Sequence, residues 1–174
     1  SNNQHTGELR IARGPVSINS TSALGVTPDS AVVFRPRYKH SDSWRPRLTY
    51  NGSGGTSAHT LKLGGWQADG ILESTGSGPL VWSGNVVIGP YAENPKQVLT
   101  RDISLTLGAS STSGENIFSG IISDEGVNVI YLNSDNSTNS GPAIMRINKT
   151  GSGTWALTGN NAYSGPTTLN GGTL

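Results

Sequence analysis

Apolar and polar residues alternate along the chain in short runs, and Gly, Asn, Ser or Pro separates one run from the next. Such period-2 alternation predicts β-strands that bury one face. No stretch carries apolar residues at helical spacing without an interruption by Gly, Pro or a β-branched residue. We therefore predict an all-β fold, with strands at 8–12, 16–18, 31–34, 48–50, 60–63, 70–72, 80–82, 86–88, 97–99, 103–107, 117–122, 127–132, 143–147, 154–158 and 167–169.

Composition narrows the class of protein further. The 174 residues include 24 Gly, and only 13% are charged, which sets the chain apart from helical or α/β enzymes and predicts one domain, 1–174. The absence of cysteine excludes disulfides and cysteine-ligated metals. No apolar run is long enough to span a membrane. The chain begins at Ser1 without Met or a signal peptide, so we expect a processed product or an excised segment.

Two internal segments resemble each other. Residues 76–85 match residues 151–160 at five of ten positions, at an offset of 75 residues. In a solenoid with rungs of roughly 20–25 residues, this offset is close to a whole number of rungs and places both segments on one wall. The alternative is chance matching of Gly and Ser in a Gly-rich chain.

The C-terminal third carries a recognisable pattern. Residues 151–174 alternate short apolar strands with Gly and Asn turns, 117–123 have the form of an opening strand, and 148–155 that of a middle segment. Together they resemble the autotransporter-associated β-strand repeat of bacterial surface proteins, over 116–174. The resemblance implies a right-handed parallel β-helix on the surface of a Gram-negative-type bacterium or outside it, with no catalytic residues to transfer. Residues 1–115 either continue this β-helix or form a β-sandwich-like or irregular part.

Within the last rung, we predict which side chains point inward and where the chain loops. By period 2, Trp155, Leu157 and Leu169 point inward, whereas the threonines at 154, 158 and 168 face solvent. Residues 135–142 are rich in Ser and Asn, and we expect a longer loop there.

Charge is distributed unevenly along the chain. Residues 1–62 hold eight Lys or Arg against three Asp or Glu, and residues 63–174 hold four against eight. In a solenoid the sequence order is also the axial order, so one end is basic and the other acidic. Opposite ends of two copies then attract.

A basic and aromatic segment at 35–47 is the most prominent candidate for binding. Its candidate residues for a glycan or another anion are Arg35, Arg37, Tyr38, Lys39, Trp44, Arg45 and Arg47. Arginines beside aromatic rings bind acidic glycans, lipopolysaccharide phosphates or nucleic acid, although we disfavour nucleic acid here. Alternatively, the segment is a Pro-stiffened loop that projects from the solenoid, with arginines covering neighbouring aromatic rings.

Nothing in the sequence indicates an enzyme. The acidic residues are scattered singly, and the adjacent Asp124 and Glu125 face opposite sides of a strand, so they cannot jointly flank a glycosidic bond. Asp69 and Glu73 straddle a strand. The three histidines lack the spacing of a zinc or nucleophile motif. We predict a non-enzymatic protein without cofactor or metal.

Neither end of the predicted solenoid carries an evident cap. The pattern stops at residue 174 where another strand is expected, and residues 6–14 have the form of that continuation. We therefore predict a structural module of an extracellular fibre or surface stalk that joins copies head to tail. The alternatives are a binding segment of an autotransporter adhesin passenger, which recognises an acidic glycan or a host cell surface, and, third, a polysaccharide-active enzyme. The predicted assembly contacts are Leu9, Ile11, Leu169, Thr173 and Leu174.

Overall fold

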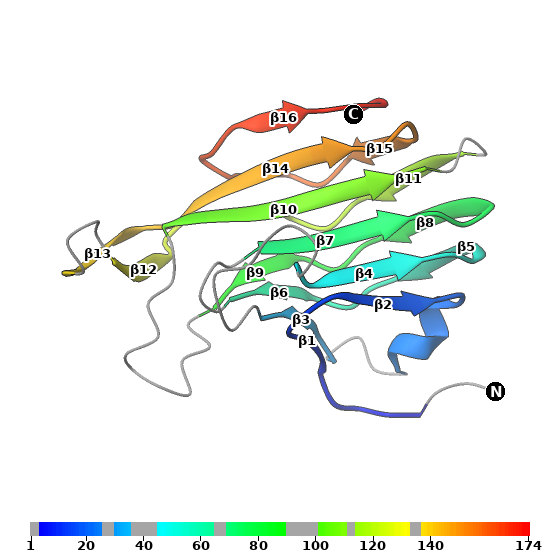
Figure 1. Ribbon diagram of the computed structural model, residues 1–174, viewed down its shortest axis with the longest axis horizontal. Coiled ribbons are helices and arrows are strands. Elements are labelled where there is room, and N and C mark those ends of the chain that lie inside the picture. Colours follow the sequence, from blue (N-terminus) through cyan, green and yellow to red (C-terminus); the bar gives the residue numbers. More distant parts are fainter. Residues whose placement is uncertain are drawn as a thin grey trace.

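Three parallel sheets form the walls of the molecule (Figure 1). The computed structural model describes residues 4–25, 30–35, 45–64, 69–89, 101–110, 114–132 and 137–174. The first wall contains β1 (Leu9–Ile11), β3 (Val32–Phe34), β6 (Leu61–Leu63) and β9 (Val86–Ile88). The second wall contains β2 (Pro15–Ile18), β4 (Arg47–Tyr50), β7 (Asp69–Ser74), β10 (Asp102–Ala109), β14 (Ile144–Thr150) and β16 (Thr167–Leu169). The third wall contains β5 (Ser53–Ser57), β8 (Gly78–Trp82), β11 (Glu115–Phe118) and β15 (Thr154–Leu157).

The chain visits the first, second and third walls in turn and then repeats, which is the path of a parallel β-helix. In the first coil, the short 3-10 helix η1 (Thr21–Leu24) stands where the third wall has a strand in the next coil, and it packs against β5. In the fifth and sixth coils, single parallel bridges at Ile122, Ala162 and Thr173 continue the walls. The predicted β-helix is confirmed, and the strands that the structure describes before residue 115 belong to it rather than to a separate β-sandwich.

The interior consists of side chains that align from coil to coil. On the second wall, Leu48, Leu72 and Leu107 are in register, and each is fully buried. Parallel strands in register place equivalent residues directly above one another, so a period-2 pattern in each coil becomes a continuous apolar column. Burial of each such side chain contributes about 1.5–3 kcal/mol.

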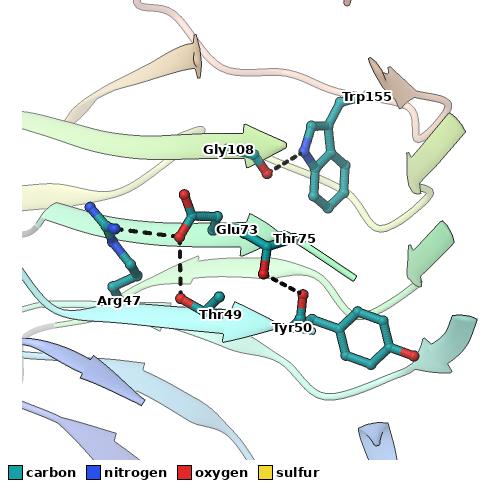
Figure 2. A network of polar contacts seen from close by, with 7 residues as sticks. All are labelled: Arg47, Thr49, Tyr50, Glu73, Thr75, Gly108 and Trp155. Carbon is teal, nitrogen blue, oxygen red and sulfur yellow. Dashed lines mark hydrogen bonds and ion pairs between the residues drawn. The ribbon is translucent and has the colours of Figure 1, made fainter. Parts of the chain in front are cut away.

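Large and small residues compensate each other across the interior. Tyr50 is buried in the second coil, and its hydroxyl accepts a hydrogen bond from the Gly54 N–H at 3.0 Å. A Cβ atom at Gly55 would lie 3.1 Å from that hydroxyl oxygen. Three coils later, the large side chain of Trp155 is fully buried in the interior. Its indole N–H donates to the Gly108 carbonyl at 3.0 Å (Figure 2). Native packing density explains why small residues face large ones.

A stack of glycines forms the corner that follows the third wall. A Cβ atom at Gly84 would lie 2.1 Å from the His59 carbonyl oxygen, one at Gly120 would lie 2.0 Å from that of Gly84, and one at Gly159 would lie 2.2 Å from that of Gly120. Glycine is therefore required here because successive backbones touch. Val81 pairs with Ile117, which pairs with Ala156, so the two similar segments lie on one wall, as predicted. The 75-residue offset corresponds to two coils of 36 and 39 residues, however, and not to rungs of roughly 20–25 residues.

The structure corrects three expectations. Residues 53–57 form β5 although their Ser-Gly-rich sequence has no apolar alternation, because β8 supplies the pairing partner. Part of the expected loop at 135–142 is β13 (Thr138–Pro142), antiparallel to β12 (Asn128–Leu132). Leu169, predicted inward, is 55% exposed because β16 lies at the edge of its sheet. The predicted strand at 97–99 lies outside the described residues.

Candidate functional site

A groove of about 360 Å³ lies on the outer face of the second wall. The side chains that line it come from five successive coils, and most of them are polar: Arg45, Arg47, Ile71, Glu73, Thr106, Asn148, Thr150 and Asn170. The register of the sheet creates this alignment, because Arg47, Ile71, Thr106 and Asn148 pair in turn across β4, β7, β10 and β14. The groove therefore runs along the solenoid axis, across the strands.

Gly108 provides the hollow in this face. It pairs with Glu73 on one side and Thr150 on the other, and both of these side chains line the groove. A Cβ atom on Gly108 would lie 3.1 Å from the Glu73 Cγ atom. Because glycine has no side chain, the outward row is interrupted between two polar residues.

Ion pairs hold the basic end of the groove in place. Arg47 Nη1 lies 3.4 Å from Glu73 Oε2, and the Thr49 hydroxyl donates to the same oxygen at 3.2 Å (Figure 2). Arg45 Nε lies 3.9 Å from Asp69 Oδ2. These partners sit on neighbouring coils, so each contact fixes a side chain of one coil against the next.

The basic segment predicted from the sequence is only partly displayed at this groove. Arg45 and Arg47 line it, whereas Arg35 is buried, with 8% of its surface exposed. The other four candidates of the segment lie outside the described residues: Arg37, Tyr38, Lys39 and Trp44. The sequence did not single out the polar residues that complete the groove, because they lie on later coils. The signal of those that lie in strands is the outward position in a period-2 pattern, whereas Asn170 follows β16.

The two carboxylates at this groove do not have the spacing of a glycosidase pair. Among the residues that line the groove, Glu73 is the acid. Asp69 lies on the same face of β7 four residues earlier, a separation of about 13 Å along an extended strand. Paired catalytic carboxylates lie about 5–9.5 Å apart. Within the described part of the chain, no three His, Asp or Glu residues gather as a metal site would require.

The predicted assembly residues lie at the two ends of the solenoid. Leu9 is half-buried and Ile11 is buried in β1, the edge strand of the first wall. At the other end, Leu169 and Leu174 are 55% and 39% exposed, and Thr173 bridges to residue 154 of the third wall. β2 and β16 are the opposite edges of the second wall.

An ionic cluster secures the first coils. The Glu8 carboxylate accepts a hydrogen bond from Lys62 Nζ at 2.6 Å and another from Arg10 Nε at 3.1 Å. The hydrogen bond from Lys62 is the main reason that the pKa of Glu8 lies below its usual value, and burial opposes it. Since Lys62 lies on the third coil, the contact reaches across β3.

The last two coils contain two buried charged groups. The Asp124 carboxylate accepts from the Met145 N–H at 2.6 Å and from the Ser164 hydroxyl at 2.7 Å. Burial alone raises the pKa of Asp124, but these bonds and the Ser164 N–H outweigh it and hold the pKa below its usual value. Lys149 Nζ donates to the carbonyls of Thr150, Gly151 and Gly171 at 2.8–3.0 Å, and burial lowers the pKa of Lys149.

The described residues contain no helix that is both long and apolar enough to span a membrane. Comparison with known proteins places the chain in a family context. Residues 147–174 match the passenger-associated-transport-repeat. The chain is 31% identical over 129 residues to the adhesin BmaC autotransporter of Brucella suis biovar 1 (strain 1330), a match that covers 73% of this chain but 3% of that protein. No solved structure matches the chain. Residues 147–174 thus carry an autotransporter passenger repeat, which confirms the predicted family for this part of the 116–174 resemblance.

Proposed function

We propose that the chain is a β-helical segment of an autotransporter adhesin passenger, displayed on the surface of a Gram-negative bacterium as a rigid stalk. The observation that carries this proposal is the uninterrupted second wall, in which six parallel strands stack from β2 to β16. A stack of this kind extends along one axis, and each coil contacts only its neighbours. Such a structure separates a binding region from the cell envelope without needing a catalytic site.

The similarity to an adhesin supports the surface location. The chain spans 3% of the length of that relative, so the activity of the whole protein is part of the proposal. Catalysis ranks last among the candidate functions. A glycosidase requires a pair of carboxylates at close range, and the groove offers Glu73 without a second acid among its lining residues.

Surface labelling tests the proposal. An antibody raised against the purified chain should stain intact cells of the producing bacterium, and brief protease treatment of those cells should remove the stain. An antibody against a periplasmic protein of the same cells serves as the control. Staining that requires permeabilised cells would contradict a surface role.

Head-to-tail assembly is a second candidate, and the exposure of β16 favours it. The two outer edges of the second wall, β2 and β16, are parallel strands of one sheet, so β2 of one copy has the direction needed to extend β16 of another. The net charge of +5 over residues 1–62 and of −4 over residues 63–174 supports the same polarity. Electron microscopy of the purified chain, with its mass measured alongside, decides this: long filaments support assembly, and monodisperse particles exclude it.

A further inference from the structure

The groove on the second wall has the form of a site for an extended ligand. It is lined by side chains of five successive coils, from Arg47 on β4 to Asn170 after β16. Neighbouring strands of a sheet lie about 4.8 Å apart, so the four intervals between β4 and β16 span about 19 Å. A chain of several linked units fits this length, whereas a single small metabolite does not require it.

The lining favours a hydroxyl-rich ligand. Thr106, Asn148, Thr150 and Asn170 offer hydroxyl and amide groups that both donate and accept hydrogen bonds. A sugar hydroxyl also donates and accepts, so it matches the side chains that the fourth, fifth and sixth coils present. Ile71 adds an apolar surface against which the carbon face of a sugar ring packs. The lining residues include no aromatic side chain, and single-stranded nucleic acid binds by stacking its bases on aromatic rings.

Charge in the groove favours an anionic sugar. Arg45, Arg47 and Glu73 line one end, so the lining residues carry a net charge of +1. Asp69 lies outside the lining and contacts Arg45 at 3.9 Å. The Arg47 side chain is 39% exposed, and it contacts Glu73 through Nη1 at 3.4 Å. A guanidinium carries five N–H donors. Arg47 therefore has the geometry to bind a ligand carboxylate through its planar fork while Glu73 steadies it.

Hydrogen bonds between neighbouring coils hold side chains of the groove in place. Glu73 is held by both Arg47 and Thr49, and Asn148 donates to the Ser104 hydroxyl at 2.6 Å. Preorganised side chains lower the entropy that binding costs. We propose that this groove binds an acidic oligosaccharide along the solenoid axis, with a ligand carboxylate at Arg45 and Arg47 and hydroxyls at the Thr and Asn side chains. This assignment does not depend on surface display or on assembly.

Calorimetric titration of the 174-residue chain tests the proposal. The probes are a short oligogalacturonate, its neutral methyl ester and polyglutamate as a flexible polyanion without sugar hydroxyls. We expect the oligogalacturonate to bind, and the other two to bind at least about tenfold more weakly, which corresponds to about 1.4 kcal/mol. Absence of oligogalacturonate binding, or equal binding of either comparison probe, would overturn the assignment.

Variants then place the ligand. Gly108→Val fills the hollow and should abolish binding. Arg47→Gln should weaken it by about tenfold or more, since the neutral side chain no longer makes charge-assisted hydrogen bonds to a ligand carboxylate. Arg10→Gln is the matched control, because Arg10 also forms an ion pair with a glutamate but lies on the first wall. Thr150→Val keeps the shape of the side chain, and we expect it to weaken binding even if Gly108→Val fails to fold. Unchanged affinity in Arg47→Gln and Thr150→Val would contradict the proposed site.

Discussion

In the middle coils the interior consists mainly of aligned apolar side chains, with Ser74 and Asn116 as buried polar residues, whereas in the last two coils the charged side chains of Asp124 and Lys149 are buried. One column shows the change: Leu72 and Leu107 are fully buried, Lys149 takes the next position and is also fully buried, and Leu169 after it is 55% exposed. A leucine gains free energy in proportion to the area it removes from water. At the edge strand this gain is small, so an apolar side chain alone holds the last coil weakly.

Directional contacts replace the missing apolar burial. Lys149 reaches the carbonyls of Gly151 and Gly171, and thereby joins two successive turns. Asp124 joins the fifth coil to the sixth through Ser164. Buried charges are costly unless they are hydrogen-bonded. We infer that the last coils depend on a few specific polar residues, while the middle coils depend on packing and close backbone contact.

The largest expected effect comes from substituting glycine in each region. Gly120→Val in the middle coils forces a side chain into the Gly84 backbone and should destabilise the fold by more than about 4 kcal/mol. Gly165 lies in the last coil, and a Cβ atom there would lie 2.3 Å from the carbonyl oxygen of Met145 on β14, so Gly165→Val forces these two coils apart. We expect this second variant to release the last coil and leave the earlier coils folded.

Hydrogen exchange of the backbone amides separates the two outcomes. Gly120→Val should remove protection throughout the chain, and Gly165→Val should remove it only after about residue 160. Gly141→Ala is the control, since its nearest contact would be an ordinary 3.5 Å from Tyr131. Equal loss of protection in both valine variants would contradict the difference between the two regions.

Asp124→Ala should cost about 2–4 kcal/mol, because it leaves the buried Met145 N–H and the Ser164 groups without their acceptor. The exposed neighbour Glu125 gives a matched control, and Glu125→Ala should change the free energy of unfolding by less than about 0.5 kcal/mol. Chemical denaturation of both variants measures the difference. If the two alanine variants proved equally stable, the carboxylate of Asp124 would not be a tie between coils.

The pKa of Asp124 predicts how acid affects the stability of the last coils. The folded state lowers the pKa of Asp124, so the stabilisation is complete above the ordinary aspartate value of about 3.9 and is lost as pH falls through the lower folded pKa. Asp124→Asn should flatten this part of the stability profile.

Lys149→Met should destabilise the last turn by about 1–3 kcal/mol, since the carbonyls of Gly151 and Gly171 lose their shared donor. Methionine keeps the column filled, so the effect reports the hydrogen bonds rather than a cavity. Leu107→Met, one coil earlier in the same column, should cost less than about 1.5 kcal/mol. Faster amide exchange near residue 171 in Lys149→Met is the expected signal. A more stable variant would mean that desolvation of the ammonium outweighs its bonds.

These residues also show how far the sequence predicts the structure. Apolar residues at period 2 identified β10 and β14, because each coil buries one face of its own strand. The sequence did not predict β5. Its glycines are explained by the close approach of Tyr50 and by pairing with β8, and both of these lie in other parts of the chain. A strand whose sequence is set by its neighbours has no local signal.

The sequence could not predict the groove, for a different reason. Its register partners Arg47, Ile71, Thr106, Asn148 and Thr168 are separated by 24, 35, 42 and 20 residues, so no fixed period connects them. Loops of unequal length lie between the walls, and only the pairing of strands brings Arg47 to Glu73. The two arginines were predicted as a binding candidate from local composition, whereas their polar partners required the register.

The smallest expected effect is the pH dependence of stability that His59 causes in the second coil. It occurs at higher pH than the effect of Asp124. His59 is 7% exposed, and its Nδ1 lies 3.0 Å from the Ser57 hydroxyl oxygen. Burial, followed by the nearby charge of His5, lowers the pKa of His59. The folded state therefore binds this proton less readily than the unfolded chain, and stability declines as pH falls from about 6.5 toward the folded pKa.

His59→Gln should remove this decline, and His5→Gln should reduce it, because the second change removes only the charge contribution. Thermal unfolding between pH 7 and pH 5 measures the slope in each protein. In this range Asp124 remains ionised, so any loss of stability comes from the early coils while the polar contacts of the last coils are intact. A slope that survives in His59→Gln but disappears in Asp124→Asn would reverse that assignment and place the more pH-sensitive contacts at the end of the solenoid.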